Sequence, residues 1–117
     1  MMNKTIWVSY DLGMKGDYEG MYNWLDRNNA VERGYNLALI KDYAIDQEIS
    51  TDEELKNYLK EQIQNFVAIG KSDRIYIMWK GLSDGKLKGA FIFGGMKAAP
   101  WTGFYQKNEG LIDEGIE

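Results

Sequence analysis

The sequence predicts an α+β domain of two layers, in which two helices pack on a mixed sheet of four to five strands in the order β-α-β-α-β-β. Stretches in which apolar residues alternate with polar ones are separated by two stretches of helical spacing. The length of 117 residues is typical of one domain. We expect residues 1–105 to form this domain and residues 106–117, an acidic stretch with glycines, to be a flexible tail.

The first strand is expected at residues 5–12, TIWVSYDL, where β-branched and aromatic residues alternate with polar ones. The glycine-bracketed loop GMKG follows, and Asp17 is well placed to cap a helix over residues 18–30. Gly34 is a plausible stop for this helix. Its expected buried stripe consists of Tyr18, Met21, Tyr22 and Leu25.

The second strand is expected at residues 35–45, where the run LALI indicates that both faces are partly covered. Ser50 and Glu53 have the spacing of a capping box, which predicts the start of a second helix that ends near Gly70. Its expected buried stripe consists of Leu55, Leu59, Ile63 and Phe66.

Residues 74–81 and 86–95 predict an antiparallel hairpin, because the intervening SDGK contains an Asp-Gly pair suited to a tight turn. Residues 96–106 predict an ordered loop or a short edge strand. If both helices lie on one face of the sheet, the other face is exposed and shows aromatics such as Trp7 and Trp79 or their neighbours. Such a face usually has a partner, often a second copy of the chain.

The amino-acid composition limits which side chains could act in catalysis or bind a metal ion. It has no cysteine and no histidine, so disulfides, thiolate metal sites and histidine bases are excluded. The net charge of −4 argues mildly against nucleic-acid binding. No apolar run is long enough for a transmembrane helix, and the first residues lack the pattern of a signal peptide, so we expect a cytoplasmic protein without a membrane partner.

The junction after the first strand is the first candidate site. Asp11 is the candidate catalytic residue, and Asp11 with Asp17 could hold Mg²⁺ or Mn²⁺, which prefer oxygen ligands and can activate water for phosphodiester cleavage. Tyr10 and Lys15 are candidate binding residues beside them. The structural alternative is that Asp17 caps the helix and Asp11 bonds to the turn.

The second candidate site is the aromatic and basic stretch around the predicted hairpin. Aromatic rings can stack on bases while lysines meet phosphates, so this stretch could bind single-stranded nucleic acid. The alternative is a core hairpin with solvated lysines. The candidate binding residues are Trp79, Lys88, Phe91, Phe93 and Trp101.

The stretch WVSYDL resembles the start of the small ferredoxin-like CRISPR-adaptation subunits and of the related virulence-associated D toxins. The resemblance covers roughly the first 40 residues and carries over only Tyr10 and Asp11. It implies dimers formed through the sheet and, in some members, metal-dependent nuclease activity through that aspartate. The family has two strands between its helices, whereas this sequence predicts one, and its nucleic-acid surface is commonly basic.

Three functions remain open from the sequence. The preferred one is a non-catalytic interaction module without cofactor, which forms a homodimer, or binds another protein, through an exposed sheet face. The second is a bacterial Mg²⁺- or Mn²⁺-dependent nuclease built around Asp11. The third is a single-strand nucleic-acid binder that uses the hairpin and Trp101.

Overall fold

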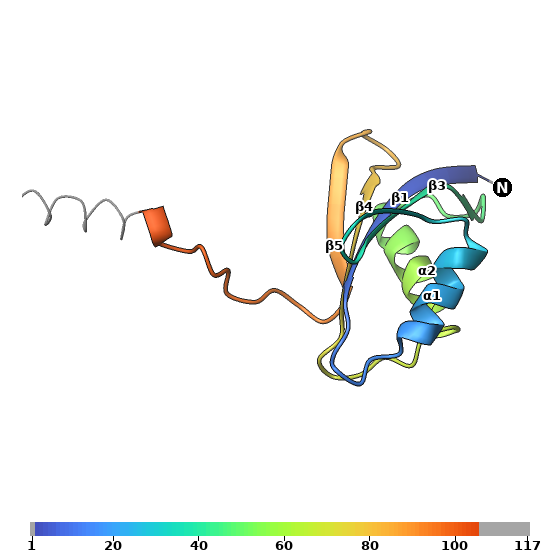
Figure 1. Cartoon of the computed structure of the whole chain (residues 1–117). Helices are drawn as coiled ribbons and strands as arrows, with labels where there is room; N and C mark the ends of the chain where they lie inside the picture. The colour runs from blue at the N-terminus through green and yellow to red at the C-terminus, as the bar shows by residue number, and fades with distance from the viewer. Residues whose placement is uncertain (1, 106–117) are drawn as a thin grey trace, which may run out of the picture.

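The computed structural model describes residues 2–105, in which two helices pack on one face of a five-stranded sheet (Figure 1). The α+β class predicted from the sequence is therefore confirmed. The expected tail at residues 106–117 lies outside the described residues. The elements are β1 (Met2–Asp11), α1 (Tyr18–Arg27), β2 (Val31–Gly34), β3 (Leu37–Ile45), α2 (Asp52–Gln64), β4 (Arg74–Lys80) and β5 (Leu87–Phe93).

The strand order across the sheet is β2-β3-β1-β4-β5, and every one of these pairings is antiparallel. The sheet is thus antiparallel rather than mixed. The first six elements follow the order β-α-β-β-α-β of the ferredoxin-like split βαβ motif, and β5 extends the sheet beside β4. The predicted hairpin of β4 and β5 is confirmed.

Strand β2 corrects the prediction of a single strand between the helices. Helix α1 ends at Arg27, and Asn29 adopts φ 55°, a left-handed conformation that asparagine tolerates and that reverses the chain. Val31 to Gly34 then pair with β3 at the sheet edge. Gly34 therefore belongs to a strand and does not stop a helix. The sequence VERG is too short and too polar to show a strand period.

Both helices bury their apolar stripes against the same face of the sheet. Trp24 of α1 and Leu59 of α2 belong to one core cluster with Ile6 and Ile77 of the two central strands. The stripe of α1 differs from the predicted one, because Trp24 is buried whereas Tyr22 is 53% exposed.

The opposite face of the sheet is not covered by either helix (Figure 1). Trp7 of β1 lies between Leu39 of β3 and Met78 of β4, and in the next row Tyr76 lies opposite Phe91. Leu39 is shielded from solvent yet is not part of the core cluster, as expected for a residue packed on this other face. We call this surface the open face; its apolar residues are Trp7, Val31, Leu37, Leu39, Tyr76, Met78, Leu87 and Phe91.

Helix α2 begins one residue later than predicted. Thr51, rather than Ser50, is the N-cap, and its hydroxyl accepts a hydrogen bond from the backbone N–H of Glu54 at 3.1 Å. The Glu54 carboxylate accepts the Thr51 N–H in return, which completes a capping box shifted by one position. The helix ends at Gln64, six residues before Gly70.

Candidate functional site

A shallow pocket of about 220 Å³ lies at one end of the open face, where β1, β4 and β5 meet. The Arg74 guanidinium stands 5.5 Å from the centre of the Phe91 ring, and its Nη1 is 3.5 Å from Oδ2 of Asp11. Tyr76 meets Phe91 edge-on, with ring centres 4.8 Å apart. The pocket thus combines an aromatic wall, one cation and one anion.

Asp11 is accessible in this pocket. Its side chain is 65% exposed, and the contact with Arg74 is long for an ion pair. Among residues 2–105, no group of three or more acidic side chains is arranged to hold a metal ion. The catalytic role of Asp11 and the Mg²⁺ or Mn²⁺ site therefore stay predictions.

Asp17 is the N-cap of α1, as one of the two readings of the sequence expected. Its Oδ1 accepts the N–H of Gly20 at 2.9 Å, and its Oδ2 accepts the N–H of Ala68 at 2.9 Å, just after α2. These bonds, that from Ala68 first, hold the pKa of Asp17 below its usual value. Each oxygen already accepts a backbone hydrogen bond, which supports the interpretation of Asp17 as a helix cap.

Asp73 is a structural acid that sequence reasoning missed. It is only 3% exposed, and its two oxygens accept the N–H groups of Gly13 and Gly70, each at 2.7 Å. Asp73 therefore ties the GMKG loop to the turn before β4. A side chain at Gly13 would collide with the Ser72 hydroxyl, which would have to move. Lys15 lines a small pocket beside this loop.

The hairpin candidates are divided between the two faces of the sheet. Trp79 pairs with Ile6 and is 4% exposed, so the prediction that it shares an exposed face with Trp7 is wrong. A β-bulge in β5 turns Phe93 into the core, whereas Phe91 lies on the open face. Trp101 is 74% exposed in the segment after β5, which contains no strand within residues 96–105. These residues do not form one binding surface.

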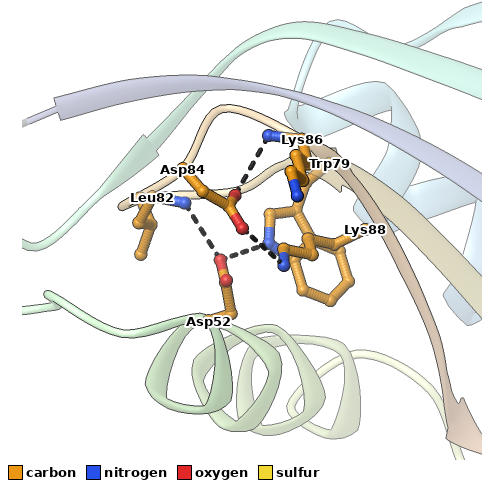
Figure 2. Close-up of polar contacts among 6 residues, drawn as sticks. All are labelled: Asp52, Trp79, Leu82, Asp84, Lys86 and Lys88. Carbon is orange, nitrogen blue, oxygen red and sulfur yellow. Dashed lines mark hydrogen bonds and ion pairs between the residues drawn. The ribbon is translucent and has the colours of Figure 1, made fainter.

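Trp79 and Lys88 instead take part in a polar clip between α2 and the β4–β5 turn (Figure 2). Asp52, the first residue of α2, accepts hydrogen bonds from Nε1 of Trp79 at 2.8 Å and from the N–H of Leu82 at 3.0 Å. Asp84 in the turn accepts a bond from Nζ of Lys88 at 3.0 Å. This arrangement explains the buried indole and the paired lysine without a ligand.

The clip predicts a pH dependence of stability. Hydrogen bonds from Trp79 and then Leu82 hold the pKa of Asp52 below its usual 3.8. A carboxyl with a lowered pKa stabilises the fold above its unfolded pKa, and this contribution disappears as the pH falls through the folded value. We expect Asp52→Asn to flatten the loss of unfolding free energy between about pH 5 and pH 2 in urea titrations. An unchanged pH profile in this variant would contradict the assignment.

Comparison of the chain with models of protein families, with curated proteins and with solved structures finds no match. Neither α1 nor α2 is long and apolar enough to cross a membrane, a statement that concerns residues 2–105. The fold and the surfaces thus define an antiparallel α+β domain with one uncovered, largely apolar sheet face.

Proposed function

We propose that the protein is a non-catalytic interaction module that forms a homodimer through the open face. The observation that carries this proposal is the apolar character of a sheet face that neither helix covers. A contiguous apolar surface in contact with water is typical of an interaction site, since its burial contributes about 25 cal/mol per Å². The cytoplasmic location expected from the sequence stays part of this proposal.

A second copy of the chain is the partner that the charges favour. A two-fold dimer brings the same surface together from both subunits, so that surface must complement itself. The open face ends at Asp11 and Arg74, which carry opposite charges and contact each other only at 3.5 Å. In a two-fold pairing, the arginine of one subunit would meet the aspartate of the other and give the apolar patch a polar rim.

Met78→Glu tests this proposal, because it places a charge in the middle of the open face. Size-exclusion chromatography with light scattering should give twice the chain mass of 13.5 kDa for the wild type and the single mass for the variant. Met14→Glu is the matched control, since Met14 is fully exposed in the loop before α1 and should leave the dimer intact. Far-UV circular dichroism checks the fold of each variant.

Two outcomes would contradict the homodimer. A wild-type protein that stays at the single mass at concentrations of roughly 1 mM would exclude any stable self-association, because such a dimer would be weaker than about −4 kcal/mol. A Met78→Glu variant that stays dimeric and folded would place the interface elsewhere.

A further inference from the structure

A second pocket, of about 270 Å³, lies between α1 and the β2 edge of the sheet. It is on the helix side: Glu32 of β2 pairs with Ala38, which belongs to the core cluster. The pocket shares no lining residue with the site at Asp11. Its walls include Tyr10 of β1 and Tyr22 of α1, and Leu25 contributes to its apolar part.

The aromatic walls of this pocket stand nearly at right angles. The ring centres of Tyr10 and Tyr22 are 6.4 Å apart with an angle of 77° between the ring planes, and Tyr18 extends the cluster at 5.8 Å from Tyr22. The face of an aromatic ring carries negative potential. Tyr22 is 53% exposed, so its ring can contact a positively charged group in the pocket, as aromatic rings do with alkylated ammonium groups.

The charged residues of the pocket have one sign. Asp26 and Glu32 line it, and no lysine or arginine does so among the residues that the structure describes. Within residues 2–105, neither of these acids forms an ion pair. Burial, and then the Coulombic effect of Tyr22 and Glu32, raises the pKa of Tyr10 above its usual value. The pocket is thus aromatic, anionic and open to solvent.

We propose that this pocket binds an organic ammonium cation with alkyl substituents on its nitrogen. The tyrosine faces would contact the alkyl groups, and the two carboxylates would balance the charge without removing it from water. Such a group occurs in free small molecules related to choline and on alkylated lysine side chains of proteins. The chemistry is shared by both sources, and the experiment distinguishes them.

The test is an NMR titration of the 15N-labelled protein with three probes: choline, its neutral isostere 3,3-dimethyl-1-butanol, and a short peptide that carries trimethyl-lysine. We expect saturable shifts around Tyr22 and Glu32 with the two cations and none with the alcohol. Tighter binding of choline identifies a free cation as the ligand, and tighter binding of the peptide identifies a protein-borne one.

Variants assign the binding to this pocket. Tyr22→Leu and Glu32→Gln should each weaken it about two- to fivefold, the range for a partly exposed cation–π or charge contact. Tyr105→Leu and Glu48→Gln are matched controls, because both residues are exposed and do not line the pocket. The Met78→Glu variant should bind as the wild type does, so this proposal and the homodimer can fail separately.

Three results would overturn the proposal. The first is the absence of saturable shifts with either cation up to roughly 50 mM, which would mean that any binding is weaker than about −1.8 kcal/mol. The second is an equal response to the neutral alcohol, which would mean that the pocket recognises shape and not charge. The third is unchanged affinity in both Tyr22→Leu and Glu32→Gln.

Discussion

Trp79→Ala is expected to lower the free energy of unfolding by about 3–5 kcal/mol, the range for removing a large aromatic side chain from a core. Trp79 is 4% exposed and belongs to the core cluster beneath the helices. Its loss also removes one of the two donors that hold Asp52 at the start of α2. A domain of this size is stable by about 5–15 kcal/mol, so the variant should unfold at a much lower urea concentration.

Trp7→Ala is the matched control for this prediction. Trp7 lies on the neighbouring strand but on the open face, where it is only partly shielded from solvent. Both substitutions are best compared at the same low protein concentration, so that a dimer adds little to the measured stability. Under these conditions, Trp7→Ala should cost less than about 1.5 kcal/mol. Equal losses for the two tryptophans would contradict the assignment of opposite faces.

These two tryptophans show that the register between the strands could not be predicted from the sequence. The alternation within β1 was read correctly, and such alternation fixes which residues of one strand share a face. It does not fix the register between strands, and a shift of one residue exchanges the two faces. Only the observed pairing of Trp79 with Ile6 places it in the core.

Strand β2 shows a second limit. The β4–β5 hairpin and the start of α2, which have clear sequence signals, were predicted within a few residues, whereas α2 ends six residues before the predicted end. Val31 to Gly34 form a short edge strand, and the structure shows two asparagines with positive φ on either side of it, Asn29 and Asn36. Without this strand, the β-α-β-β-α-β order of the first six elements was not visible. That order is shared by proteins of many functions and does not assign one.

The candidate sites depend even more on the strand order. The helix cap at Asp17 was predictable because the N–H that its side chain accepts within α1, that of Gly20, is only three residues away in the sequence. The tyrosine pocket was not, since Tyr10, Tyr22 and Glu32 meet only after the sheet order is known. The helical spacing of α1 predicted that Tyr22 is buried. In the structure Tyr22 is exposed, and Trp24, which was not part of the predicted stripe, is buried.

Asp73→Ala is expected to lower the free energy of unfolding by about 1–3 kcal/mol, because it removes the acceptor of two backbone N–H groups, of which Gly13 is half-buried and Gly70 is exposed to water. Gly13 and Gly70 lose their acceptors together, and the loops that they anchor flank the start of α1 and the start of β4. Hydrogen exchange of these two amides should accelerate by more than the global loss of stability explains.

Two further variants separate this role from a general effect of removing an acid. Asp46→Ala removes an exposed acid that accepts one N–H, from Glu48, and should cost less than about 1 kcal/mol. Asp73→Asn retains one carbonyl oxygen and should lose less stability than Asp73→Ala, since an amide can still accept from one of the two glycines. If Asp73→Ala costs no more than Asp46→Ala, the GMKG loop is held by its own turn geometry, and Asp73 is not its anchor.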